Sequence, residues 1–204
     1  GTLFGNVILN RYLKSTKFVK NSLSPTELKK FEATIGFFKK YSDKYGFDWL
    51  MIAAQGYQES QLDQSKRSPA GAIGVMQLLP TTAADKNVGI PDIEKIDKNI
   101  HAGAKYMRFL MDRYFQDEAI APLDRVLFSF AAYNAGPSRV INLRAEAKEK
   151  GLDPNVWMNN VERIAAKRIG RETVQYVSNI YKYWIAYKLL VERGQARKAA
   201  KAQE

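Results

Sequence analysis

The sequence predicts an all-α protein that contains at most a minor β-hairpin. Apolar residues recur at the three- and four-residue spacing of a helix face through most of the 204 residues. Capping residues, glycines and prolines divide these stretches into separate segments. No stretch alternates convincingly between apolar and polar residues, so any sheet is at most a minor hairpin near Ile90. We therefore expect helices joined by short loops.

Two helices are predicted in the first third of the chain. Residues 24–27, Ser-Pro-Thr-Glu, form a capping box with proline at the first helical position, and Gly46 ends the helix that follows. The apolar residues of this helix recur at helical spacing: Leu28, Phe31, Ile35 and Phe38. Asp48 can cap a second helix, which runs roughly over residues 49–60.

The middle of the chain is predicted to hold a structured loop and two more helices. Residues 68–74 contain too much glycine and proline for a regular helix. A helix is expected from Asp97 onward, with one apolar face: Ile100, Ala104, Met107, Met111 and Tyr114. Residues 124–134 form a short and strongly apolar helix, which Ala-Gly-Pro at 135–137 ends.

Three further helices are expected after this break. Residues 139–150 are predicted to form a polar helix, and residues 155–168 another one. A long final helix follows, with apolar residues at helical spacing: Val174, Val177, Tyr181 and Trp184. The chain shows no internal repeat of 20 to 50 residues, which argues against a solenoid.

The amino-acid composition excludes several kinds of site. The chain has one histidine, His101, and no cysteine, so Ser-His-Asp and Cys-His systems compete for a single imidazole. A zinc site of the usual His/Cys type cannot be assembled. The formal net charge of +11 predicts an anionic partner, either nucleic acid or an acidic polysaccharide. No run of residues is long and apolar enough to span a bilayer. With a single histidine and no cysteine, the chain must use carboxylates, hydroxyls and amides for any chemistry.

Glu59 is the first candidate for catalysis. It follows residues 50–58, in which small and apolar residues predominate, at the end of the second predicted helix. Burial there would raise the pKa of the carboxyl group and let it hold a proton near neutral pH, which a general acid requires. From composition alone, the alternative is a glutamate that faces solvent at a helix end.

Three other stretches combine close backbone packing with polar side chains. Residues 71–78 contain two glycines and Gln77, whose amide can donate and accept hydrogen bonds. Tyr133 and Asn134 offer an aromatic face and an amide, a mixture that suits sugars. Glu172 begins the final helix. Each stretch also has a structural explanation: a glycine-rich turn, a core tyrosine with a helix-capping amide, and an acid that complements a helix dipole.

Taken together and in order, four motifs resemble those of the lytic murein transglycosylases, bacterial enzymes related to goose-type lysozyme. The motifs are Glu59-Ser60, Ser-Pro-Ala-Gly-Ala-Ile-Gly-Val-Met-Gln at 68–77, Ala-Ala-Tyr-Asn-Ala-Gly at 131–136, and Glu172-Thr-x-x-Tyr176-Val. The resemblance covers about residues 45–187 and implies a lysozyme-like (goose-type) helical domain with a substrate groove. Within glycoside hydrolase family 23, the chain is most similar to the membrane-bound lytic transglycosylase F type.

The resemblance implies an activity on peptidoglycan. The β-1,4 bond between N-acetylmuramic acid and N-acetylglucosamine would be cleaved without water, leaving 1,6-anhydromuramoyl ends, with Glu59 acting first as general acid and then as general base. The residues implied to line the glycan groove or to orient the catalytic carboxyl are Ser68, Gln77, Tyr133, Asn134, Glu172 and Tyr176. Ser60 is expected to support the helix end and His101 to be structural. No metal and no organic cofactor is implied.

The resemblance also implies a domain organisation and a location. Residues 24–190 would be the catalytic domain, residues 1–23 a basic remnant of a preceding solute-binding-like domain, and residues 191–204 a polar tail. The expected partners are peptidoglycan glycan strands and not nucleic acid, and the chain is expected to be a monomer. The location implied is the periplasm of the bacterial cell envelope, at the outer membrane for the F type.

Two alternative functions stay open at this point. The same site could let water attack the sugar, which would make the protein a hydrolytic muramidase. The cleft could also hold glycan or nucleic acid without cutting it. Nucleic acid is disfavoured because the motif residues are neutral or acidic, where phosphate contacts would require Arg and Lys.

Overall fold

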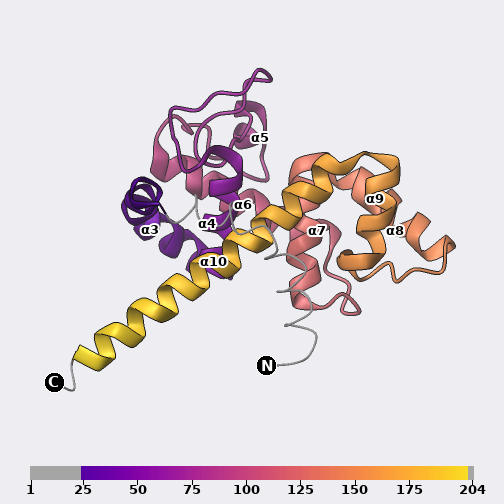
Figure 1. Ribbon diagram of the computed structural model, residues 1–204. Coiled ribbons are helices and arrows are strands. Elements are labelled where there is room, and N and C mark those ends of the chain that lie inside the picture. The colour runs from indigo at the N-terminus through magenta and orange to yellow at the C-terminus, as the bar shows by residue number, and fades with distance from the viewer. Residues whose placement is uncertain (1–23, 202–204) are drawn as a thin grey trace.

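In the computed structural model, residues 24–201 are described, with side chains as far as Glu192, and they form helices and loops without any strand (Figure 1). The predicted all-α class is therefore confirmed. The basic segment predicted at residues 1–23 lies outside the described residues. None of the described helices combines the length and the apolar character needed to cross a membrane.

The first helix begins and ends where the sequence predicts. In α3 (Pro25–Tyr45), the side chain of Ser24 accepts a hydrogen bond of 3.4 Å from the backbone N–H of Glu27. Gly46 ends the helix with a left-handed backbone, φ 69°, a conformation that glycine adopts without steric penalty. The apolar face of α3 buries Phe31 and Phe38, which anchor the helix to the core.

The second helix, α4 (Trp49–Ser60), also matches its prediction. The carboxylate of Asp48 accepts a hydrogen bond of 2.9 Å from the N–H of Leu50 and so caps the helix. Nearly every residue of α4 is buried, because α3 and α10 (Arg171–Lys201) pack against it. Glu59 lies in the last turn of this helix and is half-buried, between the buried residues Tyr57 and Ser60.

Residues 61–79 form a loop that includes the structured segment predicted at residues 68–74, and α5 (Pro80–Ala84) follows it. The loop contains two isolated β-bridges, from Arg67 to Ile73 and from Ile73 to Leu78. No strand forms near Ile90 among the described residues, which agrees with the limit of at most a minor hairpin. The N–H of Ile90 instead donates to the carbonyl oxygen of Ala83 at 2.8 Å, which folds this segment back onto α5.

The helix predicted from Asp97 is α6 (Ile96–Tyr114), and the apolar helix before the Ala-Gly-Pro break is α7 (Pro122–Ala135). The polar helix that follows, α8 (Pro137–Glu149), starts two residues earlier than expected because Pro137 takes the first helical position.

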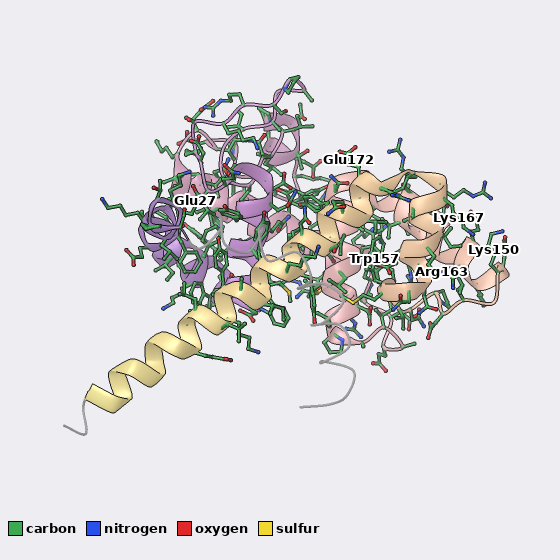
Figure 2. The ribbon with its side chains drawn as sticks, viewed as in Figure 1. Glu27, Lys150, Trp157, Arg163, Lys167 and Glu172 are labelled. Atoms are coloured by element: carbon green, nitrogen blue, oxygen red, sulfur yellow. The ribbon has the colours of Figure 1, made fainter. Side chains whose placement is uncertain are left out.

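The prediction of a single helix over residues 155–168 is wrong in its first half. The segment consists of a distorted turn, η1 (Trp157–Val161), followed by α9 (Glu162–Arg168). Asn159 has a left-handed backbone, φ 61°, so no continuous helix can pass through it. The turn is held by a hydrogen bond of 2.8 Å from the N–H of Trp157 to the Asp124 carboxylate, with the buried Trp157 ring between the helices (Figure 2).

The long final helix, α10, joins the two parts of the fold. In Figure 1, α3 to α6 lie on one side, α7 to α9 lie on the other, and α10 runs across both. It packs against α4, α7 and α9, and its described backbone continues as helix through Lys201. The main hydrophobic core contains residues from both groups of helices. A smaller core is formed by buried residues between Ile73 and Ala102. The first turns of α10 therefore meet the ends of α4 and α7.

Candidate functional site

Glu59 and Tyr176 meet where α4 ends and α10 begins. The hydroxyl of Tyr176 donates a hydrogen bond of 2.5 Å to Oε1 of Glu59, across 117 positions of sequence. Tyr176 is buried, and Glu59 is half-buried with its carboxyl group turned into the protein. Gln55, one turn before Glu59 on α4, donates from Nε2 to the Tyr176 hydroxyl oxygen at 3.3 Å. The two helices thus supply three polar side chains, Gln55, Tyr176 and Glu59, that are connected by hydrogen bonds inside an apolar core.

The environment of Glu59 favours the protonated carboxyl group. Burial raises its pKa from 4.5 to about 7, although the hydrogen bond from Tyr176 and the positive charge of Lys66 both act in the opposite direction. The Lys66 ammonium group lies close because it donates to the carbonyl oxygen of Glu59 at 2.6 Å. A carboxyl group with a pKa near neutrality can both release and recover a proton, as a general acid and base must.

Ser68 and Gln77 shape the loop that passes Glu59. The hydroxyl of Ser68 accepts from the N–H of Ala72 at 2.9 Å, and the Gln77 amide donates to the carbonyl oxygens of Gly74 at 2.9 Å and Lys66 at 3.2 Å. Both side chains therefore bond to the backbone of their own loop. The structure places them in the loop that follows Glu59, with no described bond to the carboxyl group.

Two amides that the motifs do not contain hold this loop in place. Asn99 of α6 is fully buried, accepts from the N–H of Met76 at 2.8 Å and donates to the carbonyl oxygens of Ile73 and Ile93. Gln64 accepts from the N–H of Val75 and donates to the carbonyl oxygen of Ile93. In the sequence, Asn99 is visible only as a polar residue next to the apolar face that begins at Ile100. Nothing in the sequence indicates its hydrogen-bond partners.

Tyr133 and Asn134 come from the last turn of α7. The Tyr133 hydroxyl donates to the carbonyl oxygen of Met76 at 2.7 Å, which ties α7 to the loop. Burial, and then the nearby charge of Glu59, raise the pKa of Tyr133 well above its usual value, so this hydroxyl stays protonated. Asn134 is exposed, and its Oδ1 accepts from the Thr173 hydroxyl at 2.8 Å.

Glu172 differs from the other candidates because it is exposed. It lies in the first turn of α10, where Figure 2 labels it, and no described contact joins it to Glu59. The junction of α4, α7 and α10 thus brings together four of the predicted residues: Glu59, Tyr133, Asn134 and Tyr176. The loop that contains Ser68 and Gln77 lies next to it. Glu172 lies on the surface beside that junction.

The other two sequence expectations concern Ser60 and His101. The Ser60 hydroxyl donates to the carbonyl oxygen of Val75 at 2.9 Å and so ties the end of α4 to the loop. His101 stacks on the ring of Tyr41, with ring centroids 4.2 Å apart, and its Nε2 lies 2.8 Å from the Tyr45 hydroxyl. Burial lowers the pKa of His101 to about 4, which keeps the imidazole neutral at pH 7.

A surface hollow of about 380 Å³ lies beside Tyr106, whose ring centroid is 5.2 Å from that of Tyr133. One residue that lines this hollow is Asp85, whose carboxyl group accepts hydrogen bonds from the backbone N–H and the side chain of Asn87. These hydrogen bonds lower the pKa of Asp85. Asp85 therefore stays ionised and is unsuited to donate a proton. Among residues 24–192, whose side chains are described, no group of three or more His, Asp or Glu could hold a metal ion.

Comparison with known proteins assigns a family to this arrangement. Residues 36–156 match the family model described as the transglycosylase SLT domain. The membrane-bound lytic murein transglycosylase F of Desulfosudis oleivorans is 36% identical over 172 residues, which is 78% of this chain and 36% of the relative. The protein of the same name from Shewanella pealeana is 32% identical over 194 residues, which is 89% of this chain and 38% of the relative. The chain thus spans about a third of the length of these relatives.

Two solved structures share the fold. An inactive mutant of the lytic transglycosylase Slt from Pseudomonas aeruginosa superposes with a TM-score of 0.62 at 23% identity, covering 90% of this chain and 29% of that one. The 70 kDa soluble lytic transglycosylase of Escherichia coli gives a TM-score of 0.54 at 23% identity, covering 90% and 30%. The lysozyme-like helical fold expected from the sequence is therefore confirmed.

Proposed function

The chain belongs to the transglycosylase SLT domain family, and on that premise we propose that it is the catalytic part of a peptidoglycan lytic transglycosylase. Its substrate would be the β-1,4 bond between N-acetylmuramic acid and N-acetylglucosamine. The observation that carries the proposal is the carboxyl group of Glu59, buried at the α4–α10 junction with a pKa of about 7 and a hydrogen bond from Tyr176.

The proposed reaction needs one catalytic carboxyl group. Glu59 gives its proton to the glycosidic oxygen as the bond from that oxygen to C1 of the muramoyl residue breaks. The 6-hydroxyl of the same residue then forms a new bond to C1, with assistance from the N-acetyl group, and its proton passes to Glu59. No water is consumed, and the product is a 1,6-anhydromuramoyl end.

The surroundings of Glu59 suit both halves of this cycle. Burial holds the proton on the carboxyl group before the bond breaks, while the hydrogen bond from Tyr176 stabilises the carboxylate that remains afterwards. An ordinary two-carboxylate glycosidase would need a second acid across the bond. The second acid in the motifs, Glu172, is exposed on the surface of α10, which supports a role in sugar contact instead.

The remaining motif residues are proposed to hold the glycan. Asn134 and Glu172 are exposed beside the junction, and Tyr133 presents an aromatic ring next to it. Ser68 and Gln77 keep the loop in shape, so their effect on the sugar would be exerted through the loop backbone. The net charge of +11 suits a polymer that carries lactyl and peptide carboxylates.

Location and organisation form part of the same proposal. The relatives are named membrane-bound, which supports a place in the bacterial cell envelope, in the periplasm and at the outer membrane. Residues 24–190 would be the catalytic domain of a longer protein, preceded by a solute-binding-like domain to which residues 1–23 belong and followed by the polar segment 191–204. We propose that this domain acts as a monomer.

Digestion of purified murein followed by mass spectrometry tests the reaction. Products that are one water lighter than the hydrolysed fragments are expected. Reducing ends alone would instead identify a hydrolytic muramidase with the same site. Glu59→Gln is expected to bind sacculi but to release no soluble fragments, whereas Glu118→Gln, the same change in an exposed loop, should behave as wild type. Unchanged release by Glu59→Gln would remove this residue from the mechanism, and binding without cleavage by the wild type would make the domain a glycan-binding module.

A further inference from the structure

Gln55 is a polar side chain in a position where packing favours an apolar one. It is fully buried on α4, between Ala54 and Gly56 in sequence. Its Oε1 is buried and has no hydrogen-bond partner among the described residues. An unpaired buried amide oxygen destabilises a fold. Because this burial destabilises the fold, we expect the hydrogen bond that the Gln55 amide does make to serve a role in the site.

That contact places Gln55 directly behind the catalytic pair. Gln55 and Glu59 are one helical turn apart, so both side chains leave α4 on the same face. Nε2 of Gln55 donates to the hydroxyl oxygen of Tyr176 at 3.3 Å, and that hydroxyl donates to Oε1 of Glu59 at 2.5 Å. The three side chains form a single row of hydrogen bonds that starts and ends on α4.

The direction of this row follows from counting hydrogens. A tyrosine hydroxyl carries one hydrogen, and it can donate that hydrogen to one acceptor while its oxygen accepts another bond. The amide N–H of Gln55 is directed at the Tyr176 oxygen, so the Tyr176 hydrogen is left for Glu59. With the amide turned over, its oxygen would compete with Glu59 for the same hydrogen.

We propose that Gln55 is a positioning residue, which fixes the Tyr176 hydroxyl so that its hydrogen is donated to Oε1 of Glu59 and the transferable proton is carried by Oε2. Oε1 is then the oxygen that stays unprotonated throughout the cycle. Oε2 gives its proton to the leaving oxygen and afterwards takes the proton of the attacking hydroxyl. The role in proton transfer rests on the proposed function, whereas the orientation of the hydrogen bonds does not.

The test measures the titration of the Glu59 carboxyl group directly, by NMR of protein labelled with ¹³C at the glutamate carboxyl. Gln55→Met has nearly the same shape but neither donates nor accepts strongly. Without Gln55, the Tyr176 hydroxyl is free to turn away, the Glu59 carboxylate loses stabilisation, and its titration midpoint should rise. Tyr176→Phe removes the donor altogether and should raise the midpoint by about one pH unit.

The double variant separates positioning from packing. If Gln55 acts through Tyr176, Gln55→Met combined with Tyr176→Phe should titrate as Tyr176→Phe alone does. Independent addition of the two shifts, or an unchanged midpoint in Gln55→Met, would overturn the proposal. Gln116→Met, the same change at an exposed loop position, is the control and should leave the midpoint unchanged. Should Gln55→Met fail to fold, Gln55→Leu makes the same comparison.

Kinetics provide the second measurement. Gln55→Met is expected to lower kcat on murein with little change in KM, and to move the pH profile upward with the NMR midpoint. Its thermal unfolding midpoint should not fall, because the unpaired amide oxygen is removed. If the wild type does not cleave murein while the titrations behave as expected, the proposed function is wrong and the positioning role stands. If murein is cleaved while Gln55→Met leaves the titration unchanged, the positioning role alone is wrong.

Discussion

The hydroxyl of Thr173 donates a hydrogen bond of 2.8 Å to Oδ1 of Asn134 and so links the first turn of α10 to the last turn of α7. Thr173 is buried, whereas Asn134 is exposed. Because this bond occupies the amide oxygen, the nitrogen of Asn134 is left to donate to a ligand. In the proposed function, this nitrogen would donate to an acceptor on the glycan, such as the carbonyl oxygen of an N-acetyl group.

Removal of the Thr173 hydroxyl should weaken binding more than it slows the chemical step. Thr173→Val keeps the shape but leaves the Asn134 amide free to turn, and we expect about a five- to tenfold loss of affinity for murein fragments. Thr173→Ser keeps the hydroxyl and is the matched control. Titration calorimetry in the Glu59→Gln background measures the affinity without turnover. Equal losses in the Val and Ser variants would show that the methyl group, and not the hydrogen bond, matters.

The buried carboxyl group of Glu59 should make the fold less stable above neutral pH. Its pKa is about 7 in the folded protein against 4.5 when exposed, so the folded state binds this proton more tightly. The stabilisation is complete below pH 4.5 and is lost as the pH rises through 7, by about 3 kcal/mol in total. Glu59→Gln, which is always neutral, should therefore be more stable than wild type at pH 8 and not at pH 4. Urea unfolding at the two pH values measures this, and an equal difference at both would contradict it.

Gly71 and Gly74 offer a matched pair of substitutions in the loop of residues 61–79. Both have a left-handed backbone, φ 75° and 85°, so alanine is strained at either position. An added Cβ at Gly74 would also lie 2.5 to 2.7 Å from the amide groups of Gln64 and Asn99, whereas at Gly71 it would meet nothing within 4 Å. We expect Gly71→Ala to cost about 1 kcal/mol of unfolding free energy and Gly74→Ala clearly more. Urea unfolding compares them; equal losses would mean that the two amides move aside.

His101 should contribute to acid sensitivity. Burial first, and then the charges of Lys44 and Lys98, lower its pKa from 6.5 to about 4. Because the unfolded chain binds this proton more readily, the stabilisation is present above pH 6.5 and is lost as the pH falls to 4. After allowance for partial exposure, the loss is about 2 kcal/mol. His101→Phe keeps the ring on Tyr41 and should flatten the stability profile between these pH values. An unchanged slope would show that other groups cause it.

The sequence alone predicts the bounds and the buried face of a helix where these depend on residues close together in the chain. The start of α3 and its end at Gly46 follow from a capping box and a glycine, and both were predicted to the residue. The stripe on α6 was visible because apolar spacing reports which face is buried.

Predictions failed where a distant contact decides the backbone. Residues 157–161 have helix-forming spacing, but the Asp124 carboxylate captures the N–H of Trp157 and the chain turns. The same limit applies to the site. Motifs identified Glu59 and Tyr176 as candidates, yet the amides of Gln55 and Asn99 meet their partners only through packing between helices. The structure was needed to show that Glu59 and Tyr176 lie side by side, and to decide between a buried Glu59 and one that faces solvent.

The distance of 117 positions between Glu59 and Tyr176 also sets an order of events during synthesis. Translation at 5 to 20 residues per second delivers the tyrosine about 6 to 23 seconds after the glutamate. A nascent or truncated chain that ends before α10 therefore holds its acid without the hydroxyl that orients it and without the helix that buries it. Among the described residues, the pairing of Glu59 with Tyr176 therefore forms only after α10 has been made.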